Sequence, residues 1–187
     1  MPFQKGQMFN AIGYIIVTTN SFLTSETKLV MGKGAAWELK MKVPGIDYEF
    51  GKMILEKCGH LGRYGLLLYR GYGALQVKYR FNEKANLELI KFSLGKLASV
   101  ANKSPRYWFN VNFPGIGNGG LNKVDVLPLL EVLPRNVYVW RKETIMKTFR
   151  ITFEDEEVEL LRNGDWTEEE ASNLLLKIAN QIEKQEE

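Results

Sequence analysis

The sequence predicts an α/β fold, in which helices cover both faces of a mixed, largely parallel sheet. Short apolar runs rich in β-branched residues alternate along the chain with stretches of helical periodicity. Two glycine-rich loops each stand between a predicted strand and a predicted helix. The 187 residues, 45% of them hydrophobic, suffice for one well-buried domain with an appendage but not for two full-size domains. We therefore expect a three-layer α/β/α sandwich over residues 1–142 and a small strand-helix extension over residues 143–187.

The first half of the expected domain is predicted from apolar runs and their stop signals. Proline cannot continue a helix, and glycine is favoured just after a helix end and in hairpin turns. The expected elements are a central strand at Ile12 to Thr19, a helix from Ala35 to Pro44, a helix from its cap Asp47 to Cys58, and two strands at Gly65 to Arg70 and Ala74 to Arg80.

The second half continues the alternation of helix and strand. Apolar residues recur at spacings of three and four between Lys84 and Ala101, which predicts a long helix with one buried face. Strands are expected at Tyr107 to Phe113 and at Asn136 to Trp140. Between them, Val124 to Leu133 predicts a short helix with Asp125 as a candidate cap.

The extension has a different character. Ile145 to Phe153 alternates like a strand, and Thr167 with Glu170 forms a capping box for a final helix. That helix carries an apolar stripe, made of Leu174, Leu175, Ile178 and Ile182. Packing against the main body is the favoured interpretation of the stripe, and a partner-binding helix is the alternative.

Composition excludes several kinds of site. The 25 basic and 22 acidic residues give a net charge of +3, which does not indicate nucleic-acid binding but leaves room for a local basic face. A single cysteine, Cys58, excludes an internal disulfide and a cysteine zinc cluster, and it suits a reducing compartment. The only histidine, His60, is expected to be a surface or capping residue. Because most histidine metal sites need more than one histidine, we expect no metal site, and we also expect no cofactor. Without an apolar run long enough to span a membrane, or a signal-peptide pattern, a cytoplasmic protein is expected.

The stretch from Phe113 to Asn122 is the strongest functional signal. It holds four glycines within six positions, between a predicted strand and a predicted helix. Bare backbone N–H groups beside a helix N-terminus bind phosphate, although a tight turn that needs positive φ explains the glycines equally well. A second such loop, Met31 to Ala36, leads into the predicted helix at Ala35. Two loops of this kind suit a ligand with two phosphates.

Ligands of open α/β sheets bind outside the carboxyl ends of the strands, where Asn20 and Lys78 are also predicted to lie. The ordered set of Gly6-Gln7, Val17 to Asn20, Val30 to Ala36 and Gly115 to Asn122 resembles a macrodomain. Macrodomains bind ADP-ribose. The sequence most resembles the branch that removes ADP-ribose from modified macromolecules, including antitoxin members that act on DNA bases. The early Pro128-Leu129 also matches this branch, and the resemblance covers about residues 3 to 142.

The resemblance implies a macrodomain-like sandwich and a role for each matching residue. Lys78 matches a catalytic lysine, Asn20 a contact to the distal ribose, and Trp140 an aromatic residue near the adenine. One loop would wrap the ribose and a phosphate, and it comprises Met31, Gly32, Lys33, Gly34, Ala35 and Ala36. The other would hold the diphosphate through its N–H groups, and it comprises Gly115, Ile116, Gly117, Asn118, Gly119, Gly120 and Leu121. From the residues alone, an edge-strand lysine that discourages aggregation is the favoured interpretation of Lys78, and the resemblance makes the two interpretations about equal.

Four departures from the family pattern bear on function. Gln7 stands where the family usually has an aspartate that binds the adenine amino group, and Asn122 also replaces an aspartate. The connection from Ser21 to Val30 is longer than in the branch and is expected to form a flap. The glycine loop lacks an acid that some relatives carry there.

We therefore expect a protein that binds ADP-ribose or a close derivative and hydrolyses an ADP-ribosyl linkage through Lys78. The alternatives are a non-catalytic ADP-ribose-binding module, a phosphatase acting on the 1″-phosphate of ADP-ribose, and, if the resemblance fails, a generic α/β nucleotide binder. Nucleic acid is expected only as a modified substrate and a membrane partner is not expected. No feature of the sequence specifies an oligomeric state.

Overall fold

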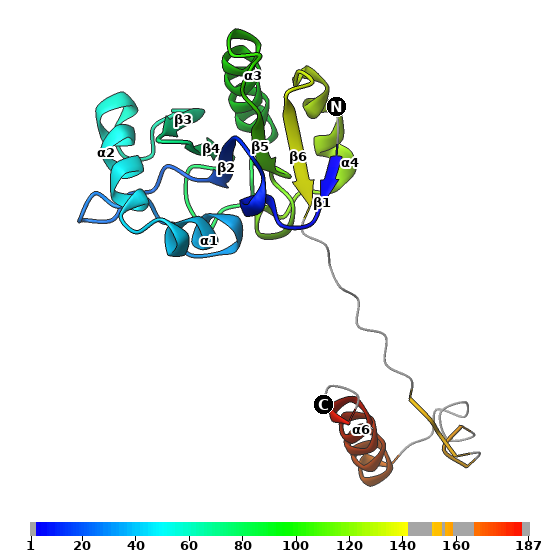
Figure 1. Cartoon of the computed structure of the whole chain (residues 1–187). Helices are drawn as coiled ribbons and strands as arrows, with labels where there is room; N and C mark the ends of the chain where they lie inside the picture. Colours follow the sequence, from blue (N-terminus) through cyan, green and yellow to red (C-terminus); the bar gives the residue numbers. More distant parts are fainter. Residues whose placement is uncertain (1–2, 142–150, 155, 159–166, 185–187) are drawn as a thin grey trace. The chain divides into compact units, whose positions relative to one another are not determined.

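The structure, a computed structural model, describes residues 3–141, 151–154, 156–158 and 167–184. By its internal contacts the chain divides into two compact units, Met1–Glu143 and Thr144–Glu187. The first unit is built around a six-stranded sheet in the order β1-β6-β5-β2-β4-β3 (Figure 1). The strands are β1 (Phe3–Lys5), β2 (Tyr14–Thr19), β3 (Leu66–Tyr69), β4 (Tyr72–Gln76), β5 (Phe109–Asn112) and β6 (Val137–Arg141).

All neighbouring strands run parallel except β3, which pairs with β4 as an antiparallel hairpin at one edge. The two-residue turn between them places Arg70 and Gly71 at positive φ, which matches the twist of a tight hairpin. The sheet is therefore mixed, as the sequence predicts, and five of its strands share one carboxyl edge.

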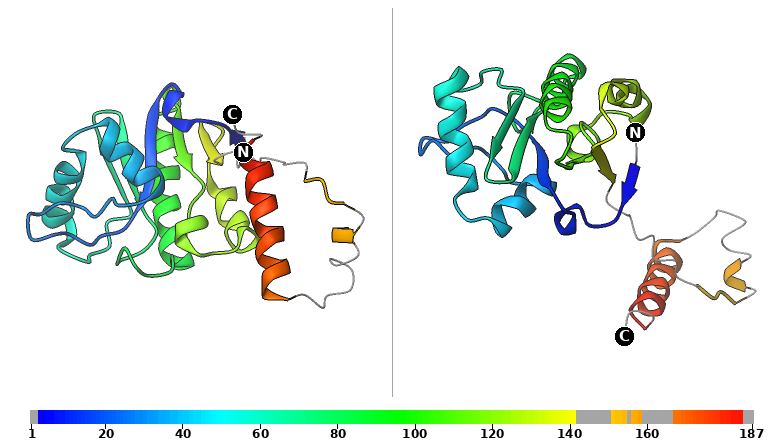
Figure 2. Two further views of the ribbon diagram at one scale, coloured as in Figure 1. Left: turned by 90° about the horizontal axis from the view of Figure 1, so that it is seen from below. Right: turned by 45° about the horizontal axis from the view of Figure 1, so that its top comes forward.

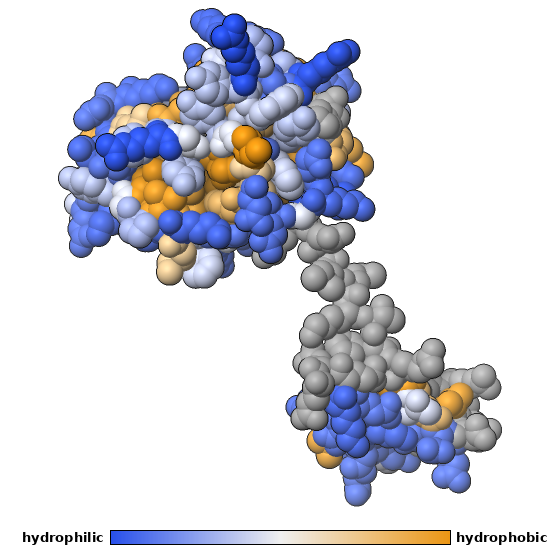
Figure 3. Space-filling view, viewed as in Figure 1, coloured by the Kyte–Doolittle hydropathy of each residue, from blue (hydrophilic) through white to orange (hydrophobic). Residues whose placement is uncertain are grey.

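Helices cover both faces of the sheet, which gives the expected three layers (Figures 1 and 2). One apolar core lies between the sheet and the helices α3 and α4, and a second lies between the sheet and α1 and α2. The α-helices are α1 (Gly34–Lys42), α2 (Ile46–Cys58), α3 (Leu87–Lys103) and α4 (Lys123–Val126), and 3-10 turns occur at η1 (Met8–Asn10), η2 (Gly117–Gly119) and η3 (Leu127–Val132). On the face drawn in Figure 3, hydrophobic side chains also reach the surface of this unit between hydrophilic ones.

Several predicted boundaries shift for identifiable reasons. The predicted central strand, β2, begins at Tyr14 rather than at Ile12. Just before it Gly13, at φ +109°, brings the chain so close to Trp108 that a Cβ would lie 2.3 Å from the Trp108 carbonyl oxygen. The predicted strand Ala74 to Arg80 ends at Gln76, so Lys78 lies just beyond it. The predicted helix Val124 to Leu133 is a single α-turn that continues as the 3-10 turn η3.

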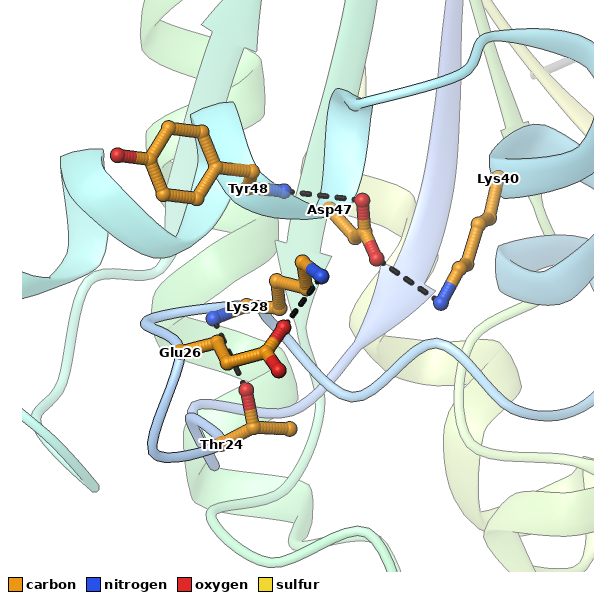
Figure 4. Close-up of polar contacts among 6 residues, drawn as sticks. All are labelled: Thr24, Glu26, Lys28, Lys40, Asp47 and Tyr48. Carbon is orange, nitrogen blue, oxygen red and sulfur yellow. Dashed lines mark hydrogen bonds and ion pairs between the residues drawn. The ribbon is translucent and has the colours of Figure 1, made fainter.

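Two predicted helix caps are wrong. Gly45, in the left-handed conformation, is the residue that precedes α2, and Asp47 lies inside the first turn, 4% exposed. There the Asp47 carboxylate accepts from its own helix, through Tyr48 N, and pairs with Lys40 Nζ at 2.9 Å (Figure 4). Asp125 likewise lies inside α4, where Asn122 is the residue that precedes the helix.

In the second unit, α6 (Glu168–Glu183) begins with the predicted capping box of Thr167 and Glu170. The side-chain amide of Gln181 donates to Thr152 O and accepts from Thr152 N, and Lys177 pairs with Glu157. The strand predicted at Ile145 to Phe153 falls mostly outside the described residues. In the predicted stripe, Leu174 is buried but Leu175 is 67% exposed.

Candidate functional site

Sequence-distant candidate residues meet at the carboxyl edge of the sheet. Gln7 follows β1, Asn20 follows β2, Lys78 follows β4, and the loop 113–122 follows β5. Because these four strands are parallel members of one sheet, their following segments emerge on the same side. The predicted candidates therefore belong to a single edge.

The two glycine loops touch each other. Gly34 begins α1, and a Cβ added to it would lie 3.2 Å from the Asn118 side-chain amide nitrogen. The glycine loop 113–122 is fixed by contacts with residues 85 and 90. Gly119 O accepts from Ala85 N at 2.8 Å, and a Cβ at Gly115 would lie 2.7 Å from the Ile90 side chain. The N-terminus of the nine-residue helix α1 and the turn at Gly117–Gly119 thus face one place, which is the arrangement that holds an anion.

The side chain of Lys78 also reaches the point where the two glycine loops meet. Its Nζ donates to Asn118 O at 3.2 Å and to Glu83 O at 3.1 Å, so the amine lies against the second glycine loop. Partial burial is the main cause that lowers the pKa of Lys78 from its ordinary value. The negative charge of Glu83 opposes the lowering of this pKa, and the positive charge of Lys33 adds to it.

Glu83 is a candidate that the sequence analysis missed. Its carboxylate accepts from Arg80 N at 3.1 Å and pairs with the Arg80 side chain, which keeps the turn after β4 closed. The glycine loop carries no acid, but this turn places a carboxylate near Lys78. The Arg80-to-Glu83 spacing was the available signal, and it is typical of ordinary surface turns.

Asn20 is buried, and its side chain organises the chain beside the site. Its Nδ2 donates to Val30 O at 2.8 Å, and its Oδ1 accepts from Phe22 N at 2.9 Å. These bonds close the base of the loop 21–30 directly before Met31. The predicted contact of Asn20 with a ribose stays a prediction.

The expected flap over the site is instead tied to α2 and its C-terminal turn. Leu29 N donates to Asp47 O, and Leu23 N donates to Nδ1 of His60, at 2.9 Å and 3.1 Å. A Cβ at Gly51, inside α2, would lie only 1.7 Å from Thr27 O. The loop 21–30 therefore packs directly on the helix backbone, and Figure 4 shows its polar side chains next to Asp47.

A buried polar network supports this edge from inside, and sequence reasoning missed it. The fully buried Gln76 amide makes four hydrogen bonds. Its Oε1 accepts from Tyr64 N and Gly65 N, and its Nε2 donates to Gly62 O and Ser21 Oγ. The Tyr64 hydroxyl contacts Thr19 Oγ1 and donates to Asn20 O, and its complete burial raises its pKa. A glutamine inside an apolar strand was the only signal.

The far end of the edge carries Gln7 and Trp140. Gln7 is exposed, and Trp140 Nε1 donates to Asn110 Oδ1 at 2.9 Å. Asn112, two residues after Asn110 on β5, makes two hydrogen bonds with Thr18, each 2.8 Å long: its Oδ1 accepts from Thr18 N, and its Nδ2 donates to Thr18 Oγ1. Asn110 and Asn112 alternate with apolar residues of β5, so they share the face of the sheet that Trp140 occupies.

Within the described residues, no group of three histidine, cysteine or carboxylate side chains is placed to hold a metal ion. No helix in the described part of the chain has the length and apolar character that crossing a membrane requires.

These features define a three-layer α/β/α protein with a candidate anion site where two glycine loops meet. Comparison with solved structures identifies the fold more closely. The macrodomain of Thermus aquaticus DarG matches with a TM-score of 0.58 and 24% identity over 76% of this chain and 97% of its own. The macrodomain of Mycobacterium tuberculosis DarG matches with a TM-score of 0.56 and 20% identity, again over 76% and 97%.

Thermosipho africanus DarTG, solved in complex with ADP-ribose, matches with a TM-score of 0.61 and 18% identity over 79% of this chain and 43% of that one. The chain therefore has the macrodomain fold, and the predicted fold class is confirmed. Neither a scan against protein-family models nor a search of curated proteins gives a match.

Proposed function

We propose that the first unit binds ADP-ribose, or a close derivative, and hydrolyses an ADP-ribosyl linkage with Lys78 as the reacting amine. The observation that carries the proposal is the Lys78 amine, which lies against the glycine loop with a lowered pKa. An amine in that place is next to the proposed diphosphate site and is more easily deprotonated than an exposed lysine.

The proposed pose assigns the diphosphate to the point where the α1 N-terminus meets the turn at Gly117–Gly119. The ribose that bears the modified group lies toward Lys78, and the adenine lies toward Gln7 and Trp140. Gln7 can accept from the adenine amino group only through a neutral amide oxygen, which is a weaker acceptor than a carboxylate. Thermosipho africanus DarTG, of which 43% matches this fold, was solved in complex with ADP-ribose, and this supports the choice of ligand.

The proposed reaction starts with the neutral amine of Lys78. Its lone pair attacks the anomeric carbon as the bond from that carbon to the modified group breaks, and the leaving group takes the proton that the resulting secondary ammonium of Lys78 releases. Water then displaces the amine from the anomeric carbon and releases ADP-ribose. We propose that the Glu83 carboxylate, whose charge acts on Lys78, accepts a proton from the attacking water.

A non-catalytic ADP-ribose-binding module is the second candidate. The glycine loop has no acid, and the Glu83 carboxylate is already engaged by Arg80. Such a module would bind ADP-ribose but would not hydrolyse any ADP-ribosyl linkage.

Calorimetric titration tests the proposed ligand. We expect the protein to bind ADP-ribose in preference to ADP, AMP and NAD, because ADP and AMP lack the distal ribose, and NAD carries a nicotinamide on the anomeric carbon where ADP-ribose has a hydroxyl group. Equal affinities for all four compounds would contradict an ADP-ribose site. If none of them binds, the glycine loops are tight turns without a role in binding these ligands.

The pH dependence of turnover tests the state of Lys78. The lowered pKa of Lys78 enlarges its neutral fraction at any given pH, so the rate should rise with pH through that pKa and level off above it. Below the pKa the amine is protonated, and the rate should fall about tenfold per pH unit. The measurement is kcat/KM against pH.

Two neighbours should move this profile in opposite directions. Glu83 raises the pKa of Lys78, so Glu83→Gln should shift the rising limb to lower pH. Lys33 lowers the same pKa, so Lys33→Gln should shift the limb to higher pH. A limb that neither variant moves would show that another group controls the rate.

A further inference from the structure

Strand β3 is the outermost strand of the sheet beyond β4, and it lies between α2 and α3 in Figure 1. The free side of β3 borders an open groove of about 520 Å³, which we call the β3 groove. Its apolar lining includes Met53 of α2, Leu66 and Leu68 of β3, and Val100 of α3. The residues assigned to the proposed ADP-ribose site lie outside this lining, so the groove is a separate surface.

The backbone of β3 presents hydrogen-bonding groups to the β3 groove. In the antiparallel ladder, alternate residues from Gly65 onwards bond to β4, because Gln76 N donates to Gly65 O at 2.8 Å. The N–H and C=O groups of Leu66 and Leu68 therefore point to the free side. Lys57 Nζ agrees with this direction, since it donates to Leu66 O at 3.2 Å. Among the described residues, nothing pairs with the two backbone groups of Leu68.

Three cations from three different segments gather at the amino end of β3. Arg63 Cζ lies 3.8 Å from the centroid of the Phe92 ring, and Lys96 Nζ lies 5.3 Å from the same centroid. That ring touches the start of β3, since a Cβ at Gly65 would lie 2.7 Å from one of its carbon atoms. Lys57 of α2 bonds to the next residue of the strand.

The balance of charge favours an acidic partner. Glu56 contributes a single carboxylate to the lining of the β3 groove, against the ammonium groups of Lys57 and Lys96. None of Lys57, Arg63 and Lys96 forms an ion pair within the described part of the chain. These cations are therefore available to carboxylates of a partner, which would fix the register of a bound segment.

A strand laid beside β3 would meet a different environment on each of its two faces. Leu67 packs in the core that α2 covers, whereas Leu66 and Leu68 pack in the core that α3 covers. The side chains of an added strand alternate in the same way. One row would lie toward Met53 of α2, and the other would lie toward α3, which carries Lys96.

We propose that the β3 groove binds an extended segment of a partner protein, in which apolar and acidic side chains alternate. The segment adds to the sheet beside β3 and bonds to the backbone of Leu68, while its carboxylates pair with the cations at the amino end of β3. A helical partner has its own backbone groups paired internally and would leave those of Leu68 unused.

Fluorescence polarisation on the full chain tests the proposal with a short labelled peptide in which valine and glutamate alternate. This peptide should bind, and a peptide that alternates valine and lysine should bind at least about tenfold more weakly, because each exposed ion pair contributes up to about 1 kcal/mol. Alternate N–H groups of a strand face its neighbour. Methylating either the valine nitrogens or the glutamate nitrogens, but not both choices, should therefore weaken binding about fivefold or more.

Charge reversal in the groove gives the first protein variant. Lys96→Glu should weaken binding of the valine-glutamate peptide about fivefold, because an attraction becomes a repulsion. Lys52→Glu is the matched control. Lys52 is an exposed lysine of α2 that lies over the Tyr48 ring and outside the lining of the groove, so this variant should bind like the wild type.

Removing one backbone donor gives the second variant. Leu68→Pro deletes an N–H that faces the groove and leaves the ladder with β4 intact, because proline is tolerated where the N–H of an edge strand faces outwards. It should weaken binding about fivefold or more relative to Leu68→Val, which keeps the N–H. Melting temperatures establish whether each variant folds, and the peptide series and Lys96→Glu decide the matter if Leu68→Pro does not.

Three results would overturn the proposal. The first is a valine-glutamate peptide that does not bind, or that binds Lys96→Glu as it binds Lys52→Glu. The second is displacement of the peptide by oligothymidine, which would make the groove a general anion surface. The third is sedimentation of the chain alone as a dimer that Leu68→Pro dissociates, which would assign the free side of β3 to a second copy of the chain.

Discussion

Lys78→Ala is expected to remove turnover of ADP-ribosyl substrates, with a loss of about 10²- to 10⁴-fold in kcat, while ADP-ribose still binds. The proposed reaction needs an amine at the anomeric carbon, and alanine supplies none. Binding should weaken by less than about fivefold, because a partly solvent-facing charge contributes at most about 1 kcal/mol. Single-turnover assays for cleavage and calorimetry for binding measure the two effects separately.

Lys78 also ties Asn118 to Glu83, so a structural role must be distinguished from a chemical one. Lys78→Arg keeps hydrogen-bond donors in place but stays charged at neutral pH, and it should be as inactive as Lys78→Ala. Lys91→Ala, at an exposed lysine of α3, should retain full turnover. An active Lys78→Arg variant would contradict attack by the amine, and loss of ADP-ribose binding in both variants would assign Lys78 to holding the loop.

Gly51→Ala is expected to lower the free energy of unfolding by about 1–3 kcal/mol, although alanine is the better helix former. The new methyl group would lie 1.7 Å from Thr27 O and 2.8 Å from Thr27 C, where backbone atoms cannot move aside cheaply. The loop 21–30 would have to lift from α2. Urea unfolding followed by circular dichroism gives the change in midpoint.

Gly95→Ala is the matched control, because Gly95 also lies inside a helix, α3, but no atom lies within 4 Å of the added carbon. This variant should raise the free energy of unfolding by about 0.5–1 kcal/mol, since alanine restricts the unfolded chain and favours the helix. Opposite signs for the same substitution would establish the contact between loop and helix. A stabilised Gly51→Ala variant would show that the loop does not rest on α2.

The layers of the fold were predictable because apolar periodicity alone separates buried strands from amphipathic helices. The central strand and the helix that became α3 are confirmed, with boundaries shifted by a few residues. The strand β1 was not predicted, because Phe3–Lys5 is too short to show a period. Strand β1 forms because it pairs with β6, which lies at the other end of the first unit's sequence.

The glycine loops were predictable as loops, since glycines between a strand and a helix have few other uses. Their contact through Gly34 and Asn118 was not, because sequence spacing carries no information on which loops meet. The Gln76 network was hidden for a related reason. A polar residue in an apolar run looks like a strand end until Tyr64, Gly62 and Ser21 are brought around it.

The pairing of β1 with β6 sets an order of assembly. The strands that carry Asn20, Lys78 and the loop 113–122 can join as soon as β2, β4 and β5 have been synthesised. Phe3–Lys5, which positions Gln7, must wait for Val137–Arg141, which contains Trp140. A growing chain therefore forms the proposed reacting end of the site first and the proposed base-recognising end last. A ribosome-bound chain that stops before residue 137 contains both glycine loops but lacks Trp140 and the strand with which Phe3–Lys5 pairs.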